Sequence, residues 1–432
     1  MTTMKSASAD FSAKELESMR ADFPILARIG RGGRPIAYLD ASATSQKPLQ
    51  VIEAEADFYR LHNAAVHRGT HLLGDESTSV YEDGRAALAQ FIGGRSDEIV
   101  WTKNATEAIN LVALSIGHAS LGRGGAAAQT LAVGAGDRIV VTRAEHHANL
   151  IPWQELCART GAELAWLDLH EDGRINLETL DVIDERTKLV AFTHVSNVTG
   201  AISPVEQIVA AARNVGALVL LDTCQSSAHL PVDVGALGID FAVFSSHKML
   251  GPTGVGALWA RRSLLEAMPP VLTGGSMIAT VTMGSAVYMD PPERFEAGSQ
   301  PIGQIAGWTV ALQYLSVYGM DRIAAHEEIL TAKMLDGISA IEGVRVLGPT
   351  DSQDRIGVVA FSVDGVHPHD VGQVMDADDV AVRVGHHCAI PLHTFFGVRS
   401  SGRASVAPMT NEDEIDRLIE SLAHVRHYFG GF

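Results

Sequence analysis

Short apolar runs alternate with amphipathic stretches between about residue 98 and residue 259. The runs are almost continuously apolar, as strands are when both faces of a parallel sheet are covered. They are EIVWT (98–102), DRIVVTR (137–143), ELAWLDL (163–169), KLVAFTHV (188–195), ALVLLD (217–222), IDFAVFS (239–245) and GVGALWA (254–260). Stretches with helical periodicity, such as residues 204–215, separate them. This alternation predicts an α/β sandwich around a mostly parallel sheet.

The pattern changes after about residue 300, where long helical stretches come first and strands follow. Helices are expected over 305–318, 321–341 and 411–428, and strands near 344–347 and 357–363. This part is therefore predicted to be a smaller α+β domain. We expect a large α/β domain over 38–299 and a small domain formed by 1–37 together with 300–432. The Ala/Gly-rich stretch 117–136 predicts a flexible loop.

Two polar residues at the ends of candidate strands suggest cofactor chemistry. Asp222 closes the run ALVLLD, and Lys248 lies downstream in FSSHKMLGPTG (244–254). Ligands bind at the C-terminal ends of strands in open α/β sheets. A deprotonated lysine can form an imine with an aldehyde, and a carboxylate can hold a pyridine nitrogen in its protonated form. The pair therefore predicts a pyridoxal 5'-phosphate (PLP) site, although a strand cap or a solvent-facing lysine explains either residue alone.

A phosphate group needs hydrogen-bond donors, and the segment that begins at Asn104 offers them. Asn104, Ala105, Thr106 and Glu107 follow the run EIVWT and open an apolar-periodic stretch, which predicts a helix N-terminus. Free N–H groups and the positive end of the helix dipole suit a phosphate, and the Thr106 hydroxyl adds a donor. An ordinary capped helix fits the same residues. Ser245 and His247, just before Lys248, are expected to complete the phosphate site.

Cys388 lies in the Gly/His-rich segment RVGHHCAIPL (383–392). A thiol there can face the cofactor as a nucleophile. A free cysteine has a pKa of about 8.5, so His386, His387, Arg383 or the cofactor must help to form the thiolate. The two histidines fit a purely structural role as well.

Eight motifs, taken together and in order, connect the chain with a known family. They are AVHRGTH (65–71), EHHANLIPW (145–153), THVSNVTG (193–200), SSHKMLGPTG (245–254), GGSMIATVTM (274–283), RFEAGS (294–299), RVGHHCA (383–389) and RAS (403–405). On these motifs the chain resembles the group II cysteine desulfurases of the Suf iron-sulfur assembly pathway, within the class V aminotransferase family, from about residue 23 to residue 428. The resemblance implies a PLP-dependent transferase of fold type I with a mostly parallel seven-stranded sheet. It also implies conversion of L-cysteine to L-alanine, with a persulfide on Cys388 that is passed to a sulfur acceptor for iron-sulfur cluster assembly.

The resemblance further assigns roles to individual residues. His146 is implied to stack on the PLP ring and to move protons, and it forms the catalytic set with Cys388 and Lys248. Arg403 is implied to bind the substrate carboxylate, with Arg383 nearby, although a surface salt bridge would explain either arginine. The implied cofactor contacts are Lys248, Asp222, Gln225, His146, Ala105, Thr106, Ser245, His247, Asn197 and Ser299, and Asn197 is also implied to contact the substrate.

The implied partners are a second copy of the chain and a sulfur acceptor of the SufE or SufU kind. In the family, Ser299 and the His67-Arg68 loop lie near the neighbouring subunit's site, which implies a homodimer with shared active sites. The chain departs from the family at Ser299, usually a threonine. It departs again after RAS, where VAPMTN (406–411) replaces the usual continuation toward Tyr-Asn-Thr. The resemblance therefore carries over no hydrogen bond from a tyrosine or asparagine at that point.

The composition fits a soluble enzyme of the cytoplasm. The 432 residues are 46% hydrophobic, and the formal net charge of -18 argues against nucleic-acid binding and against anionic membrane surfaces. Three cysteines argue against a disulfide framework; Cys224 is expected to be a packing residue and Cys157 a helix residue. Residues 1–20 lack the apolar core of a secretory signal, and no run of about 18 apolar residues could span a bilayer. No metal site is predicted.

Other functions remain compatible with parts of this residue set. A PLP aminotransferase or a β-eliminating lyase would need Lys248 and Asp222 but not Cys388. A selenocysteine lyase would share almost every residue. A sulfur-relay scaffold with little turnover of its own is an alternative from a different class, and the complete set of Lys, Asp, His, Arg and Cys argues against it.

Overall fold

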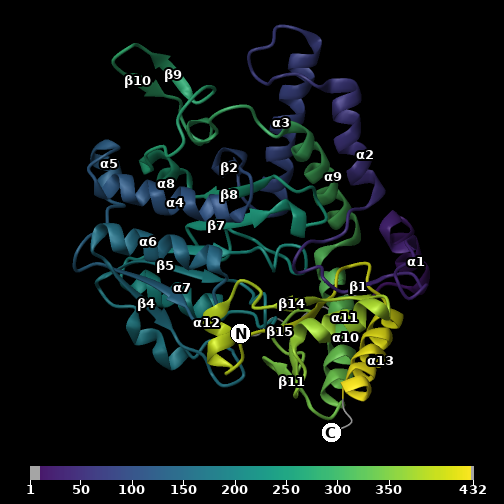
Figure 1. Ribbon diagram of the computed structural model, residues 1–432. Helices are drawn as coiled ribbons and strands as arrows, with labels where there is room; N and C mark the ends of the chain where they lie inside the picture. Colours follow the sequence, from purple (N-terminus) through teal and green to yellow (C-terminus); the bar gives the residue numbers. More distant parts are fainter. Residues whose placement is uncertain (1–9, 430–432) are drawn as a thin grey trace.

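A seven-stranded sheet forms the centre of the large lobe of the protein (Figure 1). The structure is a computed structural model that describes residues 10–429. The strand order is β2-β8-β7-β6-β5-β3-β4, and within this sheet only β8 runs antiparallel to its neighbours. The strands are β2 (Ile99–Thr102), β3 (Arg138–Thr142), β4 (Glu163–Leu167), β5 (Thr187–Thr193), β6 (Leu218–Asp222), β7 (Phe241–Ser245) and β8 (Gly256–Ala260). The predicted α/β fold with a mostly parallel seven-stranded sheet is confirmed.

Alternate residues of the central strands enter two hydrophobic cores, one on each face of the sheet. Along β7, Ala242 and Phe244 join the first core, whereas Phe241 and Val243 join the second. The helices of the first face are α3 (Leu72–Phe91), α7 (Val205–Asn214) and α9 (Ile302–Tyr318); those of the second are α4 (Ala105–Ser120), α6 (Ile151–Thr160) and α8 (Arg262–Ala267). Because both faces are covered, β6 and β7 are apolar up to the polar residue that ends each strand.

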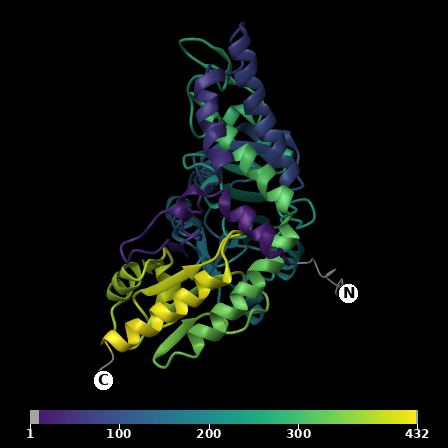
Figure 2. The same ribbon diagram turned by 90° about the vertical axis from the view of Figure 1, so that its right-hand side faces the viewer.

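The C-terminal part forms a smaller lobe around a four-stranded antiparallel sheet (Figure 2). Its order is β11-β12-β15-β14, with β11 (Val344–Leu347), β12 (Val358–Val363), β15 (Ser401–Ser405) and β14 (Arg383–Gly385). The helices α10 (Met320–Ser339), α11 (Pro368–Ala377) and α13 (Glu412–Phe429) pack on this sheet. Leu330, Phe361 and Leu418 lie in the third core that this packing creates.

Two connections join the lobes. α9 packs on α2 (Leu49–Asp57) and α3 of the large lobe and passes directly into α10 of the small one. Gly319 makes this passage with a φ of 86°, a left-handed conformation that favours glycine. The N-terminal segment forms the second connection, since β1 (Ala37–Tyr38) pairs in parallel with β13 (Val380–Ala381) of the small lobe. The division into 38–299 and 1–37 with 300–432 stays a prediction.

The Ala/Gly-rich stretch 117–136 differs from the flexible loop expected for it. α4 continues to Ser120, and a short helix, α5 (Gly125–Gln129), follows. Ala119, Ala128 and Leu131 are buried in the second core. Alanine is the best helix former and packs closely when buried, so its abundance here reflects a helical insertion rather than a linker. Within residues 10–429, no helix has both the length and the apolar character needed to cross a lipid bilayer.

Glu296, in the motif RFEAGS, fixes β2 at the edge of the large sheet. Its carboxylate accepts hydrogen bonds from Arg85 at 2.8 and 3.0 Å, from the Trp101 N–H at 2.7 Å, and from the Tyr81 hydroxyl. Arg85 and Glu296 are only 2% and 7% exposed. Trp101 belongs to β2, which leads into the start of α4, so this buried ion pair holds the strand that positions the predicted phosphate site.

We expect Glu296→Ala to lower the free energy of unfolding by about 3–5 kcal/mol, because it leaves the Arg85 charge buried without its partner. Glu296→Gln should cost less, since its amide oxygen can still accept the Trp101 N–H. Urea denaturation followed by circular dichroism measures both changes. A loss below about 1 kcal/mol in the alanine variant, typical of an exposed ion pair, would contradict this role.

Candidate active site

A cavity of about 260 Å³ lies where the carboxyl ends of the central strands meet the small lobe. Adjacent parallel strands β6 and β7 bring their ends together, which places Asp222 and Lys248 on one wall. The large lobe also contributes Ser42, Ala43, Asn104, Ala105, Thr106, His146, Ala148, Thr193, Asn197, Cys224, Gln225, Ser245 and His247. The small lobe contributes Arg383, His387, Cys388 and Arg403. Most of the residues singled out in the sequence therefore surround one cavity.

Asp222 and Lys248 are positioned by the strands that precede them. Asp222 ends β6, is 6% exposed, and accepts the Cys224 N–H through Oδ1 at 3.0 Å. Lys248 lies in the short 3-10 helix η6 (Ser246–Lys248), immediately after β7. Burial raises the pKa of the Cys224 thiol, so this cysteine is a packing residue rather than a thiolate. A buried carboxylate and a lysine on one cavity wall fit the two polar ends of a PLP ring.

The N-terminus of α4 supplies an anion site at the end of the cavity. Asn104 caps the helix by accepting the Glu107 N–H at 3.0 Å, and the Ala105 N–H donates to Ser245 Oγ at 3.0 Å. Within residues 10–429, no protein group takes up the Thr106 N–H or its hydroxyl. The Ala105 N–H is used within the protein, and the predicted contact of Ala105 with a cofactor stays a prediction. The free Thr106 donors at the positive end of a 16-residue helix suit a phosphate.

His146 presents a neutral ring to the cavity. Burial and the charge of Lys248 lower the pKa of His146 to about 3. Its Nδ1 accepts the Ala148 N–H at 3.0 Å, so the ring hydrogen is on Nε2. A flat uncharged ring of this kind can cover a cofactor face and exclude water from it.

Glu145 stiffens the segment that carries His146. Its carboxyl group is bonded to the Thr142 hydroxyl at 2.6 Å, the Asn149 amide at 2.6 Å and the Thr193 N–H at 3.0 Å. The side chain is 1% exposed, and burial raises the pKa of Glu145 to about 8. The bonds connect the ends of β3 and β5 with the loop that follows β3, and so they fix the loop that carries His146.

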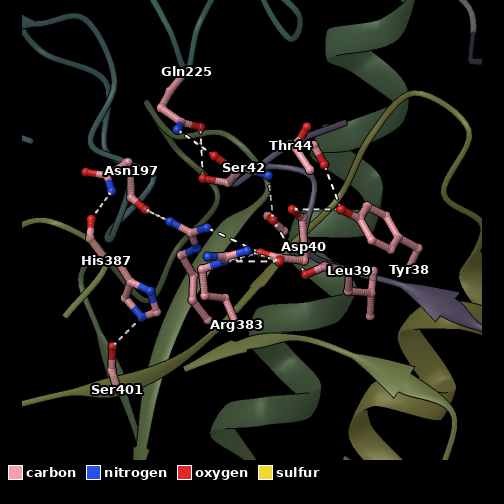
Figure 3. A network of polar contacts seen from close by, with 12 residues as sticks. Tyr38, Leu39, Asp40, Ser42, Thr44, Asn197, Gln225, Arg383, His387 and Ser401 are labelled. Carbon is pink, nitrogen blue, oxygen red and sulfur yellow. Dashed lines mark hydrogen bonds and ion pairs between the residues drawn. The ribbon is translucent and has the colours of Figure 1, made fainter. Parts of the chain in front are cut away.

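Asp40 contacts both arginines that are predicted to bind a substrate carboxylate, and Figure 3 shows its contacts with Arg383. Arg383 is half-exposed and directs its guanidinium to Asp40 through contacts of 2.9 to 3.1 Å. Arg403 is 2% exposed; its Nη1 donates to the Asn197 carbonyl at 2.8 Å and its Nη2 contacts Asp40 at 3.4 Å. The Nε–H of Arg403 is buried without a partner within residues 10–429. Arg403 therefore keeps a donor for a carboxylate, whereas Arg383 is occupied by Asp40.

Cys388 lies on the exposed turn between β14 and α12 (Ile390–Phe395). His387 and Cys388 both have left-handed backbones, with φ values of 49° and 55°. Asn197 Nδ2 donates to the His387 carbonyl at 2.7 Å, which ties the turn to the large lobe (Figure 3). One ring nitrogen each of His147 and His386 lies within 4.8 Å of the Cys388 sulfur.

A chain of hydrogen bonds fixes which nitrogen of His387 is free. His393 Nδ1 lies 3.0 Å from the Ala389 carbonyl, which can only accept, so His393 Nδ1 carries the hydrogen. The Ser401 hydroxyl must then donate to His393 Nε2 at 2.9 Å and accept from His387 Nε2 at 3.0 Å. His387 Nδ1 is left as a buried lone pair without a partner among the described residues.

The remaining predicted residues are placed less directly. Gln225 and Ser42 form two hydrogen bonds with each other, at 2.9 and 3.0 Å (Figure 3). Ser299 is outside the cavity: it lines a second cavity of about 500 Å³, which shares Thr106 with the first. His67 is exposed and contacts Glu82. The contacts of these side chains with a cofactor or a second subunit stay predictions.

Sequence reasoning missed several residues that organise the site. Asp40, Ser42, His147 and Ser401 contact predicted site residues. His147 lies in the motif EHHANLIPW but had no predicted role, and the other three lie outside the eight motifs. Asp40 lies two residues after β1 and carried one usable signal, a carboxylate at the end of an apolar run. The other three are recognisable only from contacts between segments distant in the chain.

Comparison with known proteins finds matches along most of the chain. The Aminotransferase class-V family model matches residues 37–418. The chain is 53% identical over 416 residues to a probable cysteine desulfurase of Mycobacterium leprae, covering 96% of this chain and 98% of that protein. It is 45% identical to a cysteine desulfurase of Escherichia coli O127:H6, covering 96% and 99%. The apo structure of a cysteine desulfurase from Thermococcus onnurineus matches with a TM-score of 0.88 at 36% identity, covering 96% and 98%.

His194, which follows β5 beside Asp222, should make stability depend on pH. Burial lowers its folded pKa to about 4 from 6.5, so the unfolded chain binds the proton first as the pH falls. The contribution of neutral His194 to the free energy of unfolding is intact above about pH 6.5 and is lost toward pH 4. Between pH 7 and pH 5 this loss amounts to about 2 kcal/mol. When the pH is lowered from 7 to 5, the free energy of unfolding of His194→Gln should therefore fall by about 2 kcal/mol less than that of the wild type, as measured by urea denaturation. An identical pH dependence in variant and wild type would exclude the contribution.

Proposed function

Since this chain belongs to the class-V aminotransferase family and is a PLP-dependent cysteine desulfurase, we propose that the cavity between the lobes converts L-cysteine to L-alanine with Cys388 as the sulfur acceptor. The observation that carries the proposal is that Lys248, Asp222, Arg403 and Cys388 line one cavity. A lysine and a buried carboxylate serve an aminotransferase equally well. The cysteine that lines the same cavity from the small lobe is what an aminotransferase would not need.

The residues on the large-lobe wall would hold the cofactor. Lys248 would provide the amine that anchors it, and Asp222 would accept a hydrogen bond from its ring nitrogen. Thr106, with Ser245 and His247 nearby, would donate to the phosphate, while His146 would cover the ring face as an uncharged imidazole. When bound, PLP supplies an electron-withdrawing group that makes the bonds at the substrate Cα and Cβ easier to break.

The substrate is oriented by Arg403 and Asn197. The unpartnered Nε–H of Arg403 and the neighbouring Nη2 form a fork for the α-carboxylate. Asp40 withdraws the Arg383 guanidinium from that task, so Arg383 acts through Asp40 rather than on the substrate. This geometry would leave the substrate side chain free to meet Cys388.

Sulfur transfer then takes place between two thiols. The Cys388 thiolate attacks the substrate sulfur, an S–S bond forms, and the substrate C–S bond breaks with its electron pair on carbon. One of the two thiol hydrogens ends in the methyl group of alanine and the other stays with the persulfide, so the step needs no external oxidant or reductant. Burial lowers the pKa of His387 to about 2, so its buried Nδ1 lone pair does not take up a thiol hydrogen, and His386 Nδ1 is already engaged by the Cys388 N–H.

We further propose the assembly expected for the Suf group. Ser299 and Thr106 line a second cavity that a neighbouring copy of the chain would close, which supports a homodimer. Cys388 is exposed, so a small acceptor protein of the SufE or SufU kind can reach its persulfide. Such an acceptor would deliver the sulfur to iron-sulfur cluster assembly in the cytoplasm. Selenocysteine lyase activity is the second candidate, because selenium leaves carbon more readily and would depend less on Cys388.

Lys248→Ala should lose the visible absorption band of the bound cofactor, and Cys388→Ser should retain it. Mass spectrometry after one turnover with cysteine should find one added sulfur atom on the peptide that contains Cys388. Alanine release should fall at least about 100-fold in Cys388→Ser, because a hydroxyl cannot take up sulfur. Full activity of Cys388→Ser with cysteine would refute the proposed role, and retained activity with selenocysteine alone would favour the lyase.

The enzyme should turn over slowly alone and faster with an acceptor. An acceptor protein can bind beside the turn and hold its own thiol at the exposed persulfide, whereas small free thiols react only on collision, so they should remove the persulfide slowly. Addition of a SufE-type or SufU-type protein should raise the rate of alanine formation several-fold without changing the cofactor spectrum. An unchanged rate at saturating acceptor would count against this partner class.

A further inference from the structure

The turn that carries Cys388 is held in an unfavourable backbone conformation. His387 and Cys388 are consecutive non-glycine residues in the left-handed region, at φ values of 49° and 55°. Such residues persist only where surrounding contacts determine the backbone. Within the turn, the Ala389 N–H donates to the His386 carbonyl at 2.9 Å and the Cys388 N–H donates to His386 Nδ1 at 3.1 Å. These local bonds shape the turn but do not attach it to the rest of the site.

His147 attaches the turn at two points. Its backbone N–H donates to the Cys388 carbonyl at 2.7 Å, and its ring Nε2 accepts the Ile390 N–H at 3.1 Å. The His147 ring also lies beside the His386 ring in a tilted arrangement, with centroids 5.6 Å apart and planes inclined by 37°. His147 directly follows His146, so the segment that covers the cofactor ring and the residue that binds the sulfur turn are covalent neighbours.

A metal ion is the obvious alternative ligand for two histidines and a cysteine whose ligand atoms lie within 4.8 Å of one another. A neutral imidazole has one lone pair and one hydrogen. The lone pair of His147 is taken by the Ile390 N–H, and that of His386 by the Cys388 N–H. Burial and the neighbouring His386 lower the pKa of His147, which keeps its ring neutral. Both lone pairs therefore bind the backbone of the turn and are not free for a metal.

We propose that His147 is a positioning residue that clamps the turn at Cys388 and Ile390, so that the Cys388 sulfur is aimed at the substrate from the same loop that carries His146. The inference rests on the proposed function only for the role of Cys388 as sulfur acceptor. The clamp consists of two hydrogen bonds from His147 to backbone groups of the turn, and these bonds can be measured without turnover. His147 touches neither substrate nor cofactor in this assignment.

The test compares His147→Ala with His147→Gln in the holoenzyme. The glutamine side-chain oxygen can replace Nε2 as an acceptor, whereas alanine cannot. His424→Ala is the matched control, because this exposed ring bonds only Asp378 among the described residues. Amide hydrogen exchange followed by mass spectrometry, with overlapping peptides that isolate Ile390, measures the clamp. Steady-state kinetics and the amount of sulfur on Cys388 after one turnover measure its effect.

In His147→Ala we expect the Ile390 amide to exchange about 5-fold faster, as one lost hydrogen bond predicts. We expect kcat to fall about 10-fold with KM within about 2-fold, and the cofactor spectrum to stay unchanged. His147→Gln should recover most of both effects, and His424→Ala should show neither. If the Ile390 amide exchanges faster in His147→Ala but the wild-type enzyme shows no turnover of cysteine, the clamp is supported and the proposed function fails.

Three results would overturn the proposal. The first is unchanged exchange at Ile390 in His147→Ala. The second is a glutamine variant no better than the alanine variant, which would point to a structural role of the ring. The third is stoichiometric Zn²⁺ binding to the wild-type holoenzyme, measured by calorimetry with zinc chloride, that disappears in His147→Ala, since the three residues would then be a metal site.

Discussion

Hydrogen bonds between the two lobes, made where the Cys388 turn meets the large lobe, are the interactions on which the whole site depends. The cofactor residues are fixed by the ends of β6 and β7, whereas the thiol belongs to a turn of the other lobe. Asn197 and His147 bind carbonyl groups of consecutive residues in that turn. Without these bonds the large lobe could still hold a cofactor, but the Cys388 thiol would have no fixed position relative to the cavity.

The large lobe provides a rigid base for these contacts because its strands are buried on both faces. One hydrophobic core lies on each face of the sheet at β7. The polar residues are confined to the strand ends, where a cavity can form. The buried Glu296–Arg85 pair extends this rigidity to β2 and to the start of α4. The anion site is therefore built on the same sheet that carries Asp222 and Lys248.

Local sequence signals were sufficient for the sheet and for the residues that end its strands. Asp222 and Lys248 could be predicted because each follows a long apolar run, and Thr106 because it follows a cap residue. The pairing of Asp40 with Arg383 could not, since the two lie at opposite ends of the chain. The left-handed backbone at His387 and Cys388 left no sign either, because neither residue is glycine. Helix α5 was missed because a short helix rich in alanine and glycine has the same composition as a flexible linker.

The position of Asp40 has a mechanical consequence. Arg383 and Arg403 face each other across adjacent strands β14 and β15, an arrangement of like charges that is unfavourable by itself. Asp40 offsets this repulsion, and its backbone also bridges to Ser405 next to the β1–β13 pair. An anion that binds Arg403 competes with Asp40 for the same positive charge. Occupancy of the cavity is thereby coupled electrostatically to the alignment of the N-terminal strand with the small lobe.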